Sequence, residues 1–214
     1  MSGILELLNG PMGKTLISGA SNQLGMEEGK AQSALSTALP LILGAMKNNA
    51  STPEGASGLL NALGNSKHSG GILDNLGSVL GGSGVDEDVL SDGAGILSHV
   101  FSGKEANVAQ AVSKSSGIDL SSAMNILKVA GPLVMGALGK ETRQQGVADQ
   151  NGIGNLLGGM LGGESSSQQS LVNQLLDADG DGSVIDDVAG MLLGGSSQKK
   201  SGLGGMLGGL FGGK

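Results

Sequence analysis

Apolar residues recur at three- and four-residue steps along much of this chain, which is the spacing of one face of a helix. Ala31, Leu35 and Ala38 are one example. Stretches rich in Gly, Ser, Asn and Pro separate such runs and are typical of helix ends and loops. The pattern predicts an all-α fold.

The pattern repeats when the chain is shifted by 92 residues against itself. Residues 3–46 then align with residues 95–138 without a gap, and twelve of the 44 positions are identical. The matches include Pro40 with Pro132, each within a Pro-Leu-x-x-Gly-Ala segment. We infer two copies of one helical unit, packed against each other in a multihelical array.

Each copy is predicted to hold a short first helix, a second helix that ends before Gly25 or Gly117, and a long third helix. Proline removes one helix hydrogen bond and crowds the preceding turn. We therefore expect Pro40 and Pro132 to kink or break the third helices, so that the Leu-x-x-Gly-Ala segments form separate buried half-helices. Asp119 has the residue type and position of a helix N-cap.

A Gly- and Leu-rich segment after each repeat, near residues 58–64 and 154–163, predicts one more amphipathic helix per repeat. We divide the chain into a first helical repeat (1–82), a second repeat packed on the first (83–169), a helix-loop-helix segment (170–195) and a flexible glycine-rich tail (196–214).

These repeats resemble the bacterial domain of unknown function 937 family. The resemblance is carried by the Gly-Ile-Leu openings, the Pro-Leu-x-x-Gly-Ala elements and the Gly-Leu-Leu-x-x-Leu-Gly segments, and it covers most of residues 1–195. The family is similar to small YidB-like helical proteins, so the resemblance implies a multihelical array. It implies no catalytic residues.

Residues 177–187 read Asp-Ala-Asp-Gly-Asp-Gly-Ser-Val-Ile-Asp-Asp, and short apolar runs flank them. Alternating carboxylates followed by Gly are typical of a calcium-binding loop. An EF-hand loop needs its last acid at position twelve, which is Val188 here, so the loop would be shortened and would resemble truncated EF-hand-like loops of extracellular bacterial proteins. The alternative is a solvated acidic turn. The predicted calcium ligands are Asp177, Asp179, Asp181, Ser183, Asp186 and Asp187, with either of the last two closing the loop.

The composition narrows the partners and the compartment. The chain has 42 Gly, two Phe, no Trp, Tyr or Cys, and a net charge of -7. It has no basic patch for phosphates and no aromatic platform for bases, so we expect no nucleic-acid partner.

Residues 1–8 lack the basic region of a secretory signal, and no stretch approaches the roughly 20 apolar residues of a membrane span. We predict a cytoplasmic location by default and leave export without a cleaved signal open.

The tail alternates large apolar residues with pairs of Gly over residues 202–214. Three alternatives remain open for the tail: a flexible segment, self-association or docking on a protein partner, and contact with a membrane surface.

For the whole chain, we expect a non-catalytic structural or interaction protein, because neither His68 nor His99 has a Cys or His partner at metal-binding spacing. The alternative is a membrane-active or secreted effector that uses its Gly- and Leu-rich amphipathic segments.

Overall fold

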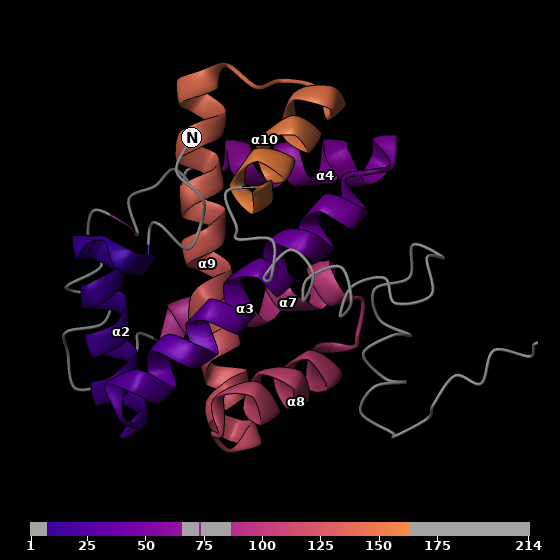
Figure 1. The fold of residues 1–214 in the computed structure, drawn as a ribbon. Coiled ribbons are helices and arrows are strands. Elements are labelled where there is room, and N and C mark those ends of the chain that lie inside the picture. The colour runs from indigo at the N-terminus through magenta and orange to yellow at the C-terminus, as the bar shows by residue number, and fades with distance from the viewer. Residues whose placement is uncertain (1–7, 66–72, 74–86, 163–214) are drawn as a thin grey trace, which may run out of the picture.

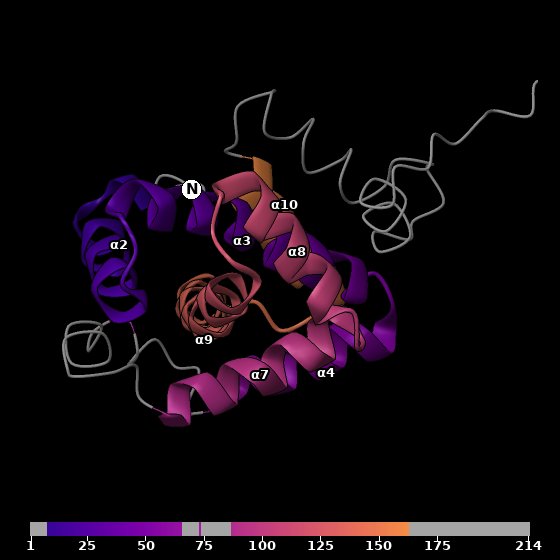
Figure 2. The ribbon, with the colours of Figure 1, turned by 90° about the horizontal axis from the view of Figure 1, so that it is seen from below.

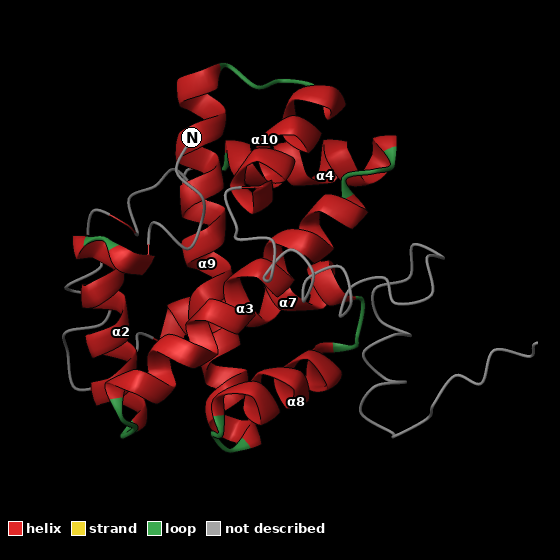
Figure 3. Ribbon diagram, viewed as in Figure 1, coloured by secondary structure: helices red, strands yellow, loops and turns green. Residues whose placement is uncertain are grey.

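The computed structural model describes residues 8–65, 73 and 87–162. Within them lie seven α-helices and no strand, which confirms the all-α prediction for this part of the chain (Figures 1 and 3). The helices are α2 (Pro11–Leu24), α3 (Glu28–Asn49), α4 (Pro53–Gly64), α7 (Glu87–Phe101), α8 (Glu105–Ser116), α9 (Leu120–Gln145) and α10 (Gln150–Gly162).

Helix α9 forms the centre of the array. Viewed along its axis, it is surrounded by α2, α3, α8 and α7 (Figure 2). Its most extensive contacts are with α7, α3 and α8. The core is one cluster of Leu, Ile, Val, Ala and Met side chains with Phe101 among them. Helices from both predicted repeats contribute to this core, while the repeat and domain boundaries stay predictions.

The two proline-containing helices are continuous. Pro40 lies inside α3 and Pro132 lies inside α9, and both prolines are buried. The prediction of separate half-helices was therefore wrong, although the Leu-x-x-Gly-Ala segments are buried as expected. A proline removes only one intrahelical hydrogen bond, and apolar burial on both sides of it keeps the helix in one piece.

The crossing of α7 over α9 lies next to Pro132. Because a proline nitrogen carries no hydrogen, Pro132 cannot donate to the carbonyl of Lys128, four residues earlier. Gly93 of α7 packs on this carbonyl so closely that a Cβ at position 93 would lie 1.8 Å from the Lys128 oxygen. The missing side chain of Gly93 thus permits the close contact between α7 and α9.

The second helices end as the sequence predicts. Gly25 follows α2 and Gly117 follows α8, and both adopt the left-handed conformation, with φ of 61° and 66°. This conformation strains residues that carry a Cβ, which explains why glycine ends each helix. Asp119 caps α9 as predicted, because its side chain accepts a hydrogen bond from the Ser122 backbone nitrogen.

Helix α9 is also long and apolar enough, by length and composition, to cross a membrane. This differs from the expectation that no such stretch exists. A buried core helix meets the same criterion, and 72% of the apolar window of α9 is buried among the other helices. Its hydropathy is accounted for by its central place in the array (Figure 2).

Candidate interaction groove

A groove of about 1410 Å³ lies between α4 and α7. The two helices lie on the same side of α9 in Figure 2 and are separated along the axis of α9 in Figure 1. Residues of α3 and α9 form the bottom of the groove. The α4 and α7 residues that line it recur at three- and four-residue steps, so each helix presents one face to it.

The groove has an apolar interior. Met46 of α3, Met135 of α9 and Val100 of α7 form its floor and are 1%, 3% and 8% exposed. Because these side chains are nearly sealed, the floor is part of the protein core. The walls are more accessible and consist of the partly buried Leu59, Ala62, Val89 and Ile96. An occupant would therefore contact the wall side chains over an apolar floor.

The corner between α3 and α4 closes one end of the groove. Asn49, the last residue of α3, donates from Nδ2 to the carbonyl oxygen of Val100 at 3.0 Å, which ties this corner to α7. Thr52 caps α4 by accepting a hydrogen bond at Oγ1 from the Gly55 nitrogen at 3.1 Å. A Cβ on Gly55 would lie 1.8 Å from the Asn49 carbonyl oxygen, so the tight corner requires glycine there. The groove end is thus held by hydrogen bonds and close backbone contact.

The rim of the groove is acidic. Glu54 of α4 and Asp88 and Asp92 of α7 line it, together with His99, and no Lys or Arg is among the lining residues. The acids follow from helix position, because Glu54 and Asp88 lie in the first turns of α4 and α7, where carboxylates interact favourably with the helix dipole. The groove therefore combines apolar walls with a negative rim.

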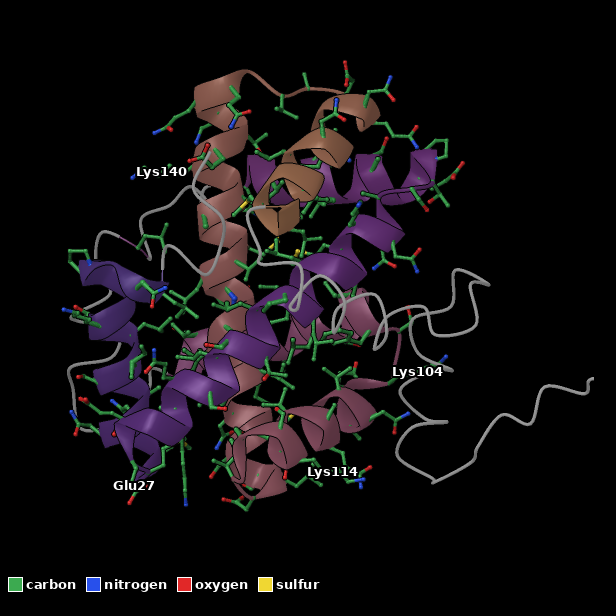
Figure 4. All side chains as sticks on the ribbon, in the orientation of Figure 1. Glu27, Lys104, Lys114 and Lys140 are labelled. Carbon is green, nitrogen blue, oxygen red and sulfur yellow. The ribbon has the colours of Figure 1, made fainter. Side chains whose placement is uncertain are left out.

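No Lys or Arg of the described helices lines the groove. Lys104 directly precedes α8, Lys114 lies in the last turn of α8, and Lys140 lies toward the end of α9 (Figure 4). All three are exposed, and none lines the groove. The groove thus has three acids and no Lys or Arg among its lining residues, which favours a cationic occupant over an anionic one.

The predicted calcium ligands at residues 177–187 lie outside the described residues, as does the tail at 196–214. Across the described ranges, no three His, Cys, Asp or Glu side chains come together in a group that could hold a metal ion. The calcium loop therefore stays a prediction from the sequence.

Sequence reasoning missed the groove. It considered His99 only as a metal ligand without a partner, whereas His99 and Asp88 line the same face of α7. Residues 88, 92, 95 and 99 follow helical spacing, and this signal was available in the sequence. What the sequence could not supply is the position of α4 opposite this face.

The residues that line the groove all lie in a part of the chain that matches a known protein family. A family model described as "Bacterial protein of unknown function (DUF937)" matches residues 6–141. The chain belongs to this family. The match confirms the resemblance inferred from the repeats, and all groove-lining residues of this DUF937 protein fall inside it. Helix α10 and the glycine-rich tail follow the matched range. No curated protein and no solved structure matches the chain.

Proposed function

We propose that this DUF937 protein is a non-catalytic helical interaction protein whose groove between α4 and α7 binds an amphipathic helix of a protein partner. The observation that carries the proposal is the combination of apolar walls from two helices with an acidic rim. Amphipathic helices bind such grooves through apolar residues at positions i, i+3, i+4 and i+7.

The size of the groove favours a helix over a small molecule. Small-molecule sites typically enclose roughly 300–1,000 Å³ and bury most of the ligand. At about 1410 Å³, the groove is larger than such sites. Its accessible apolar side chains belong to two helices, with Leu59 and Ala62 on α4 and Val89 and Ile96 on α7. A helix with an apolar stripe matches both properties.

The charge of the rim determines which residues should lie beside the apolar stripe of the partner helix. With Glu54, Asp88 and Asp92 around the groove, a partner with Lys or Arg beside its apolar stripe gains favourable electrostatic interactions. Interactions between exposed charges are screened over about 10 Å at 0.1 M salt. We therefore expect binding to weaken as salt is added, but to persist through the apolar contacts.

A designed peptide tests the proposal with the full-length protein. The probe is a fluorescent helical peptide with Leu along one stripe and Lys and Ala elsewhere, and the control peptide has the same composition in scrambled order. We expect the designed peptide to bind saturably, with a Kd in the micromolar range, as measured by fluorescence anisotropy. Weak, equal binding of the two peptides would contradict the proposal.

Two neighbouring substitutions locate the binding. Gly95 and Ala94 are both exposed on α7, but only Gly95 lines the groove. A Cβ on Gly95 would meet nothing within 4 Å, so a larger side chain fits without disturbing the fold. Gly95→Trp should fill the groove and abolish peptide binding, whereas Ala94→Trp should leave it unchanged. Equal binding by both variants would place the peptide elsewhere and overturn the groove assignment.

We also propose that residues 177–187 bind calcium and order the segment around them. The support is the Asp-x-Asp-x-Asp-Gly pattern. Calorimetric titration of calcium into chelator-treated protein should show saturable binding, with a Kd on the order of 10⁻⁴ to 10⁻³ M or somewhat tighter. An Asp177→Ala, Asp179→Ala double variant should lose it. If no heat of binding is measured up to millimolar calcium, residues 177–187 are not a calcium site and the acidic-turn alternative holds.

A further inference from the structure

We propose that, in the free protein, the chain's own glycine-rich tail occupies the groove in cis and is displaced by the partner helix. The occupant is residues 199–214. This inference rests on the proposed function, because it assigns a resident ligand to the same groove. It makes the tail an internal competitor that sets the affinity for partners.

The tail has the apolar spacing that the groove requires. Its five large apolar residues follow the positions i, i+3, i+4, i+7 and i+8 of a helix. These residues are Leu203, Met206, Leu207, Leu210 and Phe211. The positions between them are Gly, which gives a narrow helix that can approach the walls of α4 and α7 closely.

The same glycines keep the docked tail weak. Each Gly inside a helix is about 0.8–1 kcal/mol less favourable than Ala. A helix over residues 202–214 would therefore form only on docking, and ordering it would oppose part of the binding free energy. A partner helix with the same stripe and fewer glycines would bind more tightly and replace the tail.

The charge of the tail is complementary to the rim. Residues 196–214 carry three lysines, Lys199, Lys200 and Lys214, and no acid. The rest of the chain is strongly acidic, with 19 Asp and Glu against nine Lys and Arg in residues 1–195. The tail is thus a basic segment in an acidic protein, and the groove offers Glu54, Asp88 and Asp92 at its rim.

Two other segments are poorer candidates for the groove. Residues 66–86 join α4 to α7, but they carry Asp74 and Asp86 against the single Lys67. The predicted calcium loop at 177–187 carries five Asp and no base. Like charges placed together disfavour binding, so the rim selects the tail over both segments.

The covalent reach of the chain is sufficient. Helix α10 ends at Gly162, and Figure 2 places α10 on the side of α9 opposite to α7. The 40 residues from Gly162 to Gly202 can span at most about 130 Å, at roughly 3.3 Å per extended residue. A domain of this size is only a few tens of ångströms across, so the tail can pass around the array to the groove.

Disulfide trapping tests the docking of the tail in the groove. Because the chain has no native cysteine, only the two introduced cysteines can form a disulfide. One full-length variant carries Gly95→Cys and Gly208→Cys, and its matched control carries Ala94→Cys and Gly208→Cys. Position 208 lies near the middle of the apolar residues 203–211, and position 95 lies near the middle of the α7 face that lines the groove. A tail docked in either direction would therefore bring the two positions together at high effective concentration. Under mild oxidation, we expect the intrachain disulfide from position 95 to form about tenfold faster than that from position 94.

Two outcomes would overturn the inference. Equal rates from positions 95 and 94 would show that the tail does not prefer the groove. A disulfide that forms selectively from position 95 but joins two chains would assign the groove to the tail of a second copy. Gel electrophoresis without reductant separates the intrachain product from the dimer.

Competition with the designed peptide distinguishes this inference from the proposed function. In full-length protein, Leu207→Asp with Leu210→Asp should remove the resident tail and tighten peptide binding several-fold. The control Ser196→Ala with Ser197→Ala lies just before the docked residues 199–214 and should leave peptide binding unchanged. Peptide binding that is specific for the groove but unaffected by the Asp variant would refute the tail and leave the interaction function standing. Absence of peptide binding in both variants would contradict the interaction function itself.

Discussion

Helices α3 and α9 have the same buried pattern in different surroundings. Each of the twelve buried residues of α3 has a buried counterpart 92 positions later in α9. Two further α9 residues are buried where α3 is more exposed: Val129 corresponds to the partly buried Thr37, and Gly139 corresponds to the exposed Lys47. Helix α9 is enclosed by other helices, whereas α3 ends at the corner that leads to α4 (Figure 2). The sequence pattern thus defines the buried face, and the neighbours determine how far burial extends around it.

The corners that lead into α3 and α9 show the same relationship. Ser21 donates from Oγ to the Met26 carbonyl oxygen at 2.5 Å, and Ser113 donates to the Ile118 carbonyl oxygen at 2.6 Å. These pairs are related by the 92-residue shift, as are the left-handed glycines inside the two corners. Residues related by the 92-residue shift therefore make equivalent hydrogen bonds at the two corners, while the duplicated unit stays a prediction from the sequence.

The corners differ in how the following helix is capped. Asp119 accepts hydrogen bonds from Ser122, whereas Glu27 at the start of α3 makes no side-chain cap hydrogen bond. The carboxylate of Glu28 instead accepts a hydrogen bond from Ser18 of α2. The shared backbone corner thus carries two different side-chain arrangements, and the following substitutions test where the equivalence holds.

The largest effect is expected where α9 has a described contact that α3 lacks. Gly93→Ala would place a Cβ 1.8 Å from the Lys128 carbonyl oxygen and force α7 away from α9. We expect a loss of about 1–3 kcal/mol or more in the free energy of unfolding. The position 92 residues before Gly93 is Met1, which lies outside the described residues, so the first repeat offers no described counterpart.

Gly95→Ala is the control for this substitution. It lies on the same helix, and its Cβ would meet nothing within 4 Å. Alanine should therefore stabilise the protein by up to about 1 kcal/mol through helix propensity. Urea unfolding followed by far-ultraviolet circular dichroism measures both variants. Similar stabilities would show that α7 can move away from α9 at little cost.

The next effect should be equal in the two corners. Gly25→Ala and Gly117→Ala both place a Cβ on a residue with positive φ, and neither meets a neighbouring atom. Each should therefore be destabilised by about 1–2 kcal/mol from backbone strain alone. A clear difference between the two free energies of unfolding would break the equivalence of the corners.

A smaller effect is expected from the corner serines. Ser21→Ala and Ser113→Ala each remove a hydroxyl that donates to a carbonyl oxygen across the corner. A hydrogen bond of this kind contributes about 1 kcal/mol to stability. The two losses should again be similar, and the double variant should lose about their sum because the sites are separate. Unfolding of the two single variants and the double variant in urea measures this.

The fold was more predictable than the site because local rules act on single segments. Glycine at the corner ends and aspartate at position 119 have local physical reasons, and the structure confirms both. The continuity of α3 and α9 through proline was not predictable, because it depends on burial supplied by other helices. The groove depends on α4 and α7, which are separated by more than 20 residues of sequence, so no local pattern revealed that they face a common space.

The smallest expected effect is on the pH dependence of stability, which should differ between the caps of α9 and α3. The Ser122 hydroxyl donates to Asp119 at 2.6 Å and the Ser122 backbone nitrogen donates at 2.9 Å, and these hydrogen bonds lower the pKa of Asp119 below its ordinary value of 3.8. A carboxyl with a lowered pKa in the folded state stabilises the protein above its unfolded pKa, and this contribution is lost as the pH falls through the folded value.

Asp119→Asn should keep the cap, since Asn is also a good N-cap residue, and should remove this part of the acid destabilisation. Glu27→Gln should leave the stability at neutral pH unchanged, because Glu27 makes no side-chain cap hydrogen bond. Urea unfolding at neutral pH and near pH 3 compares the two variants with the unmodified protein. If Asp119→Asn lost as much stability on acidification as the unmodified protein, the cap of α9 would not depend on a charged carboxylate, and the two corners would be equivalent in this respect as well.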